Sequence, residues 1–337
     1  MLRYKINKIS QVSSEKLSVF YKEVYKKRHK SLTNNWRWWY RIGHSPFEPL
    51  ILSIDEQVIG QAGLLPADLK IEENIVPAIW FVDFAILKKF QGKGFGKILV
   101  KEWMKICPNQ ITFCNDVSLK VFKKLGWKNN LSNKRFVKPI NYFKLIPIIN
   151  QLNLNFANQL VKNFLNKKFK EKIILTPFKV SQNYNIIKDS FNNKIKHSKE
   201  NCLEILRDES WLKWRLLECP FKDELYFFEF KNSFAVVRIY NQKKLKRLNI
   251  LYQYSTDESS KNEILNLILI WSINNNVDLI WAINKDKKFN NFFTSIFNKS
   301  INFASWSENK NISDLMQKGI IDMQGIDSDV DSSLFIE

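Results

Sequence analysis

A glycine-rich turn near residue 90 constrains the fold of this chain more than any other feature. The apolar run Ile79–Leu87 predicts a buried strand, and the turn Gln91–Lys97 reads Gln-Gly-Lys-Gly-Phe-Gly-Lys. A helical pattern of apolar residues begins at Ile98. A helix that starts directly after such a turn presents unpaired backbone N–H groups and the positive end of its dipole to one ligand. We therefore expect this turn to bind a phosphate-bearing molecule.

The spacing of the glycines narrows the choice of ligand. The segment Gly92–Gly96 is G-x-G-x-G, whereas the dinucleotide-binding fingerprint is G-x-G-x-x-G. A Walker loop is excluded as well. Such a loop has four residues between its two glycines and then Lys-Ser or Lys-Thr, and this turn has neither feature. The turn instead matches Gln-x-x-Gly-x-Gly, with Gln91, Gly94 and Gly96 at the fixed positions.

The flanking segments give this pattern a context. Residues 49–65 predict two strands around an Asp-Glu-Gln turn, and Gln110–Cys114 predicts another strand. Residues 115–127 predict a short helix that ends at Gly126. Over about residues 3–140 this order resembles the GNAT superfamily of acetyl-CoA-dependent N-acetyltransferases. The resemblance implies an α+β, three-layer α/β/α fold, in which helices flank a mixed, mostly antiparallel sheet.

The second half of the chain repeats features of the first. Trp36–Tyr40, followed by Pro-Phe and a strand at Leu50, recurs as Trp211–Arg215, followed by Pro-Phe and a strand at Leu225. Further strands and a helix then follow in the same order. We infer an internal repeat of about 170 residues and a tandem pair of GNAT-like units. An unrelated α+β domain is the alternative.

The two copies differ at the turn. Tyr254–Lys261 contains no glycine that would let the backbone approach a pyrophosphate, and its two acids would repel one. We therefore predict a GNAT catalytic domain with the acetyl-CoA loop at residues 1–140 and a GNAT-like domain without the loop at 176–337. Residues 141–175 form the predicted connector helix. This helix either packs against both domains, which we favour, or lies on an anionic membrane.

The resemblance implies a role for each matching residue. Acetyl-CoA, or another acyl-CoA, is the co-substrate, and a small-molecule amine is the acceptor. The end of the long strand would pair with the pantetheine arm, the turn would hold the pyrophosphate, and the following helix would contribute further contacts. The implied cofactor-binding residues are Ile86, Leu87, Gln91, Gly92, Lys93, Gly94, Phe95, Gly96, Lys97, Asn115 and Phe122.

Two residues are candidates for catalysis. Asp83 lies within an apolar strand, where an unpartnered carboxylate is costly to bury. Some family members place an acid there that receives the amine's proton, but Asp83 could instead pair with Arg37 or Arg41 or cap a loop. Asn115 could contact the pantetheine arm or a water, or it could be the N-cap of the next helix. Many family members have a proton-donating Tyr where this chain has Phe122, and a phenyl ring cannot donate a proton.

The aromatic cluster Trp36–Tyr40 is the predicted acceptor wall, with Trp36, Arg37 and Tyr40 as substrate contacts. Aromatic faces beside an arginine suit a sugar ring carrying phosphate, so an amino-sugar nucleotide of surface-glycan synthesis is the expected acceptor. Core packing at helical spacing is the alternative for these aromatic residues.

Composition excludes several other classes of protein. The net charge is +20, of which residues 1–140 contribute +14 (25 basic and 11 acidic residues), the half with the phosphate loop. Acids are interspersed with the lysines, so no nucleic-acid stripe is predicted. The four cysteines have no C-x-x-C pairing and the three histidines are scattered, so we predict neither a metal site nor disulfides. No signal sequence or membrane span of about 20 apolar residues is visible, which favours the cytoplasm.

Two further functions fit the same sequence. One is a tandem-GNAT transferase of aminoacyl or longer acyl groups, which would need a tRNA surface or an acyl tunnel. The other is a non-catalytic protein that binds CoA or lipid, suggested by the basic charge and by Phe122.

Overall fold

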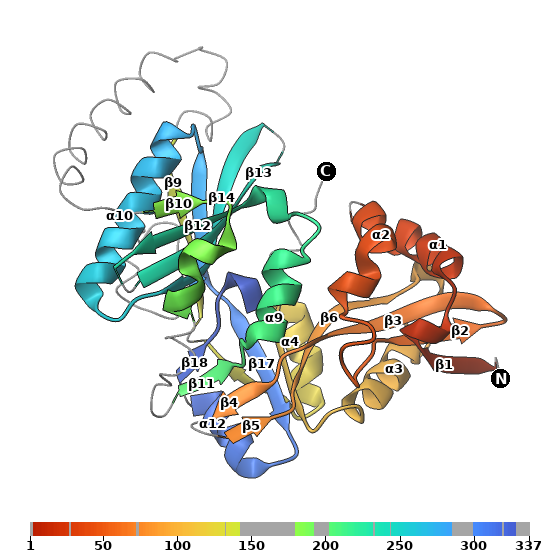
Figure 1. The fold of residues 1–337 in the computed structure, drawn as a ribbon. Coiled ribbons are helices and arrows are strands. Elements are labelled where there is room, and N and C mark those ends of the chain that lie inside the picture. The colour runs from red at the N-terminus through yellow and green to blue at the C-terminus, as the bar shows by residue number, and fades with distance from the viewer. Residues whose placement is uncertain are drawn as a thin grey trace.

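A seven-stranded mixed sheet forms the first half of the molecule (Figure 1). The structure is a computed structural model, and it describes residues 3–26, 28–71, 74–131, 133–141, 179–191, 202–231, 233–242, 244–284, 299–318 and 320–327. The strand order of the first sheet is β1 (Tyr4–Lys8), β2 (Leu50–Ile54), β3 (Gln57–Pro66), β6 (Ile79–Ile86), β7 (Asn109–Cys114), β17 (Asn302–Ser307) and β8 (Lys128–Asn130). Only β6 and β7 are parallel neighbours.

Helices cover both faces of the first sheet. Gln61 of β3 contacts Tyr21 of α1 (Ser14–Val24), whereas a Cβ on the preceding residue, Gly60, would contact Leu99 of α3 (Phe95–Met104). Successive residues of a strand point to opposite faces, so α1 and α3 lie on opposite faces. The helix α2 (His29–Trp39) packs beside α1, and α4 (Asp116–Lys124) follows β7. The three layers predicted from the sequence are confirmed.

A second seven-stranded sheet repeats this topology. Its order is β10 (Lys179–Ser181), β12 (Leu225–Phe230), β13 (Ser233–Gln242), β14 (Leu245–Tyr254), β15 (Leu279–Asn284), β9 (Lys134–Pro139) and β16 (Lys299–Ser300). Its only parallel pair in this order, β14 with β15, is connected by α10 (Glu258–Asn274), just as α3 connects β6 with β7. Each sheet also has a register shift where its parallel-paired strand meets the preceding one. The duplicated, tandem fold is therefore present.

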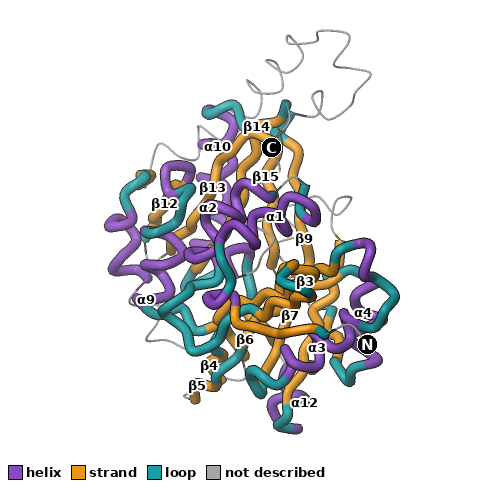
Figure 2. Tube along the Cα trace, turned by 90° about the vertical axis from the view of Figure 1, so that its right-hand side faces the viewer, coloured by secondary structure: helices purple, strands orange, loops and turns teal. Residues whose placement is uncertain are grey.

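The two sheets exchange strands. The strand β9 comes from the first half of the chain but pairs with β15 in the second sheet, and β17 comes from the second half but lies between β7 and β8 in the first. In Figure 1 the blue β17 lies among elements of the first half, and Figure 2, turned by 90°, shows β9 beside β15. The predicted division at residues 1–140 and 176–337 therefore does not separate two self-contained sheets. The predicted connector helix falls almost wholly on residues 142–178, outside the described residues.

A small third sheet also joins the halves. It consists of β18 (Ile320–Asp322), β11 (Cys202–Ile205), β4 (Leu69–Ile71) and β5 (Asn74–Val76), and β11 pairs with both β4 and β18. The remaining elements are short. They are α9 (Glu209–Leu212), which continues as the π-helical turn η4 (Lys213–Leu217), α12 (Lys310–Lys318), and single turns at Ile9–Gln11, Lys88–Phe90, Tyr184–Ile187, Lys222–Glu224 and Gly325–Asp327.

Two tryptophans, one from each of the echoed sequence segments, bind each other's backbone. The indole of Trp38 donates to the carbonyl of Trp214 at 2.9 Å, and the indole of Trp214 donates to the carbonyl of Trp38 at 2.7 Å. Arg215 lies over both indole rings, and Phe221 packs edge-on against Trp38. The two echoed sequence segments are therefore the contact between the repeats.

This contact predicts the effect of removing one indole donor. Trp214→Phe removes the indole donor and leaves the Trp38 carbonyl bound by the Arg41 N–H at 3.0 Å. The free energy of unfolding should therefore fall by about 1 kcal/mol for the lost hydrogen bond, measured by urea denaturation. Trp271→Phe on α10 is the matched control, since Trp271 packs against Tyr226 and Phe228 in the second sheet's own core. Equal losses in the two variants would show that ring area, and not the reciprocal bond, stabilises the contact.

Candidate active site

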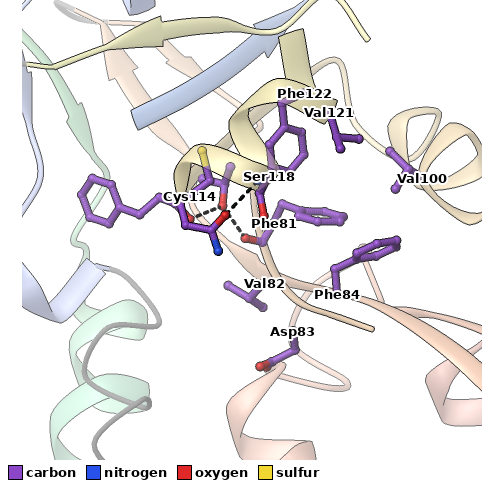
Figure 3. Close-up of a pocket in the computed structure, with 12 residues that line it drawn as sticks. Phe81, Val82, Asp83, Phe84, Val100, Cys114, Ser118, Val121 and Phe122 are labelled. Atoms are coloured by element: carbon purple, nitrogen blue, oxygen red, sulfur yellow. Dashed lines mark hydrogen bonds between the residues drawn. The ribbon is translucent and has the colours of Figure 1, made fainter. Parts of the chain in front are cut away.

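The parallel strands β6 and β7 separate after two residue pairs. Ile79 pairs with Gln110 and Trp80 with Ile111, and from there β7 pairs only with β17 on its other side. A cleft of about 250 Å³ opens between the diverging strands and the helices α3 and α4. Figure 3 shows Phe81, Phe84, Cys114, Ser118 and Phe122 around it.

A β-bulge shapes the β6 side of this cleft. Gln61 of β3 lies opposite Ala85 and Gly63 lies opposite Val82, so Asp83 and Phe84 together face a single residue of β3. Asp83 adopts the left-handed backbone conformation (φ 48°), which non-glycine residues seldom adopt. The bulge leaves the Phe84 ring 42% exposed at the cleft.

Three donors bind the Asp83 carboxylate. Arg28 donates to Oδ1 at 2.8 Å, while Trp39 and Tyr40 donate to Oδ2 at 2.9 and 3.0 Å. The hydroxyl of Tyr25 donates to the Asp83 backbone carbonyl at 2.6 Å. The alternative of an ion pair with Arg37 or Arg41 is wrong in its partner, because the ion pair of Asp83 is with Arg28. The geometry favours a structural role for Asp83, since all three donors bind its carboxylate oxygens and hold the bulge.

Buried hydroxyl groups extend this network. Tyr21 donates to Gln61 at 3.0 Å, and Gln61 donates to the Tyr40 hydroxyl at 2.6 Å. Burial, together with the negative charge of Asp83, raises the pKa of Tyr21 and of Tyr40 well above the ordinary value. Both hydroxyls therefore remain protonated at neutral pH and can keep donating.

The glycine-rich turn lies at the carboxyl end of β6 and opens α3. Gly92 and Gly94 have φ angles of 75° and 85°, and a Cβ at either position would meet no atom within 4 Å. Gly94 is the N-cap of α3, and no side chain caps this helix. The exposed lysines Lys88, Lys89, Lys93 and Lys97 surround the turn, and no acid lies between Asp83 and Glu102. The turn can therefore hold an anion through backbone amides in a positive environment.

The structure refines the roles of the residues that flank the turn. The Gln91 amide donates to the Ile86 carbonyl at 2.9 Å, so it ties the turn to the end of β6. The backbone N–H of Leu87 donates to Ile59 at 2.8 Å and its side chain is buried, which leaves it no free group for the cofactor. Phe95 is buried against Tyr4 and Phe90, and it anchors the start of α3.

Residues of α4 form the opposite wall. Asn115 is the N-cap of α4, where its side chain accepts from the Ser118 backbone N–H at 2.8 Å, so the capping alternative holds. Phe122 lines the cleft and packs against Phe81 and Trp127. Sequence reasoning missed Thr112, Cys114 and Ser118, although their places at the end of β7 and in the first turn of α4 could have indicated them.

The predicted acceptor wall is not a surface. Trp36 and Tyr40 are 3% and 0% exposed and belong to the main core, so the core alternative holds for both. Arg37 is exposed and lies over the Trp36 ring. The aromatic cluster serves the contact between the repeats and the Asp83 network, because indole and phenol groups can bury a ring and still donate a hydrogen bond.

The corresponding place in the second sheet is closed. Four residue pairs hold β14 to β15, and Gln324 bonds the backbone of Gln253 on β14 in both directions, at 2.8 and 3.0 Å. At the start of α10, Asp257 accepts from the Ser260 N–H, and these bonds lower the pKa of Asp257. The helix end that could bind a phosphate is thus capped by the chain itself.

Two further kinds of feature are absent from the described ranges. No three His, Cys, Asp or Glu side chains there gather as a metal would require. Among the helices described, none has the length and apolar character needed to cross a membrane.

Comparisons with known proteins agree with the fold. Residues 11–127 match the sequence profile of the acetyltransferase (GNAT) family, so this part of the chain is a GNAT acetyltransferase domain. No curated protein sequence matches significantly.

Solved structures extend the likeness to most of the chain. A GCN5-related N-acetyltransferase from Kribbella flavida is 10% identical with a TM-score of 0.57, covering 90% of this chain and 71% of that one. One from Anabaena variabilis is 12% identical with a TM-score of 0.57, covering 90% and 72%. Saccharomyces cerevisiae N-myristoyltransferase with bound myristoyl-CoA is 12% identical with a TM-score of 0.55, covering 90% and 79%. Both halves together thus share the fold of these structures.

The buried ion pair predicts a large effect of Asp83→Asn on stability. Asparagine leaves the Arg28 charge without its carboxylate, so the free energy of unfolding should fall by about 3 kcal/mol, measured by urea denaturation. Glu56→Gln is the control, because it breaks an exposed pair with Lys16, which should cost less than about 1 kcal/mol. If Asp83 instead acted as the catalytic base, Asp83→Asn would abolish turnover and leave stability nearly unchanged.

Cys114 provides a probe of the cleft. Burial, with a contribution from Asp116, raises the pKa of its thiol to about 11. Because only the thiolate reacts, the rate of alkylation by iodoacetamide should rise about tenfold per pH unit from pH 7 to 10, without a plateau near 9. Mass spectrometry would locate the label, and Cys114→Ser is the control. A plateau at or below pH 9 would contradict the raised pKa.

Proposed function

We propose that this protein is an N-acyltransferase that moves an acyl group from CoA to a small primary amine, with one active site per chain. The proposal rests on the cleft between β6 and β7 together with the start of α3, which no side chain caps. The two are close, because a Cβ on Gly96 would lie 3.4 Å from the Phe84 ring that lines the cleft. The second copy offers neither feature, since Asp257 caps α10 and Gln324 bonds β14.

The residues fit an acyl-CoA in a defined orientation. Backbone amides of Gly92–Lys97 would hold the pyrophosphate, and the lysines around the turn would attract the remaining phosphate charge. The pantetheine arm would lie between the separated strands, where β6 and β7 leave their facing backbone edges without a ladder partner beyond Trp80 and Ile111. The bulge at Asp83 and Phe84 would then face the thioester, whose developing oxyanion a backbone N–H can stabilise.

The same geometry limits which residues could transfer a proton. Because three donors already bind the carboxylate oxygens of Asp83, the proposed role of this residue is to hold the bulge. It is not proposed to take the amine's proton. Phe122 cannot protonate the leaving thiolate. Of the side chains that line the cleft, Thr112 and Ser118 carry hydroxyl groups.

The acceptor is proposed only as a small amine. An amino-sugar nucleotide was expected from an exposed aromatic wall, but Trp36 and Tyr40 are buried. The structural neighbours include both N-acetyltransferases and an N-myristoyltransferase, so the fold alone does not determine the length of the acyl group.

The proposal is tested by giving α3 the cap that α10 has. Gly94→Asp would occupy the helix amides and repel phosphate, so affinity for CoA and acetyl-CoA should fall about a hundredfold, measured by calorimetry. Gly43→Asp is the matched control, because Gly43 also has a positive φ (87°) and open space around its Cα. Equal CoA affinity in the two variants, or no CoA binding by the wild type, would refute the site.

A further inference from the structure

The cleft has an entrance at one end and a closed apex at the other. The glycine-rich turn follows the carboxyl end of β6, whereas the apex lies at the last ladder pair, Trp80 with Ile111. If the pyrophosphate is held at the turn, as proposed above, the pantetheine arm runs toward the apex and the acyl group is its deepest part. What closes the apex therefore decides how long an acyl group can be.

The hydroxyl of Thr112 bridges the strands just beyond the last ladder pair. Its Oγ1 lies 2.8 Å from the carbonyl of Phe81 on β6 and 3.0 Å from the carbonyl of Phe113 on its own strand. Thr112 is 3% exposed. The shorter bond joins β6 to β7 through a side chain at the position where the next backbone bond is missing, and it limits how far the strands part at the apex.

Aromatic rings make the wall beside this bridge rigid. The Phe81 ring packs edge-on against Trp103 at 4.4 Å and against Phe122 at 5.5 Å, and it lies 5.5 Å from Phe84. Close packing of this kind yields little to an inserted group. The cleft volume of about 250 Å³ equals roughly eight water molecules at ~30 Å³ each. Much of that space would be taken by the pantetheine arm.

We propose that Thr112 is a specificity-determining residue, whose bridge to Phe81 closes the apex and restricts the donor to acetyl-CoA or a similarly short acyl-CoA. This inference rests on the proposed function. A short acyl donor would distinguish this chain from the yeast N-myristoyltransferase, whose structure was solved with myristoyl-CoA.

Two substitutions separate the hydroxyl bridge from the side-chain volume. Thr112→Val keeps the shape but removes the donor, whereas Thr112→Ser keeps the donor but removes a methyl group. Calorimetry with CoA, acetyl-CoA, hexanoyl-CoA and myristoyl-CoA gives the acyl preference without a known acceptor. The wild type and Thr112→Ser should bind acetyl-CoA at least about tenfold more tightly than hexanoyl-CoA. Thr112→Val should reduce this ratio about tenfold.

The outcomes distinguish the inference from the function on which it rests. Wild-type preference for hexanoyl-CoA or myristoyl-CoA would overturn the inference while leaving CoA binding intact. A reduced preference for acetyl-CoA in Thr112→Ser but not in Thr112→Val would show that side-chain volume, and not the hydroxyl bridge, limits the length of the acyl group. That result would overturn the inference. Unchanged ratios in both variants, with melting temperatures near that of the wild type, would also overturn it. Failure of unacylated CoA to bind the wild type would refute the proposed function itself.

Discussion

Two indole rings, one from each half of the chain, donate hydrogen bonds to each other's backbone and fix the halves at one separation. The same short segment then turns inward, since the neighbouring Trp39 and Tyr40 bind the Asp83 carboxylate at the bulge. The contact between the repeats is thus continuous with the support of the cleft. A shift of α2 relative to the second half would move two of the three donors that hold the bulge.

The duplicated fold shows how little separates an open site from a closed one. Both sheets have a parallel pair joined by a helix, and both have a shifted register beside it. In the first sheet, glycines at positive φ leave the helix amides uncovered. In the second, a carboxylate caps the helix and a glutamine side chain bonds the strand that could otherwise pair with a ligand. Local polar groups, not topology, make the difference.

Local patterns in the sequence predicted much of the fold and part of the site. The turn at Gln91–Lys97, the strands on either side and the missing loop of the second copy follow from glycine spacing and hydrophobic periodicity. The Trp36–Tyr40 cluster was placed wrongly, because a sequence shows that tryptophans lie on a helix but not what that helix packs against. Arg28 was missed as the partner of Asp83, since an ion pair between residues 55 positions apart leaves no periodic signal. Nor does any local pattern indicate that β9 and β17 change sheets.

The strand exchange also determines when the first sheet can be completed. One edge of β7 borders the cleft, and its other edge pairs with β17. Until residues 302–307 emerge from the ribosome, β7 has an unpaired edge, although the whole glycine-rich turn has been synthesised long before. Such non-local pairing slows folding and exposes strand edges to other chains. The architecture thus makes the complete first sheet a late product of translation, so that a chain released after its first half would carry the glycine-rich turn without a finished sheet.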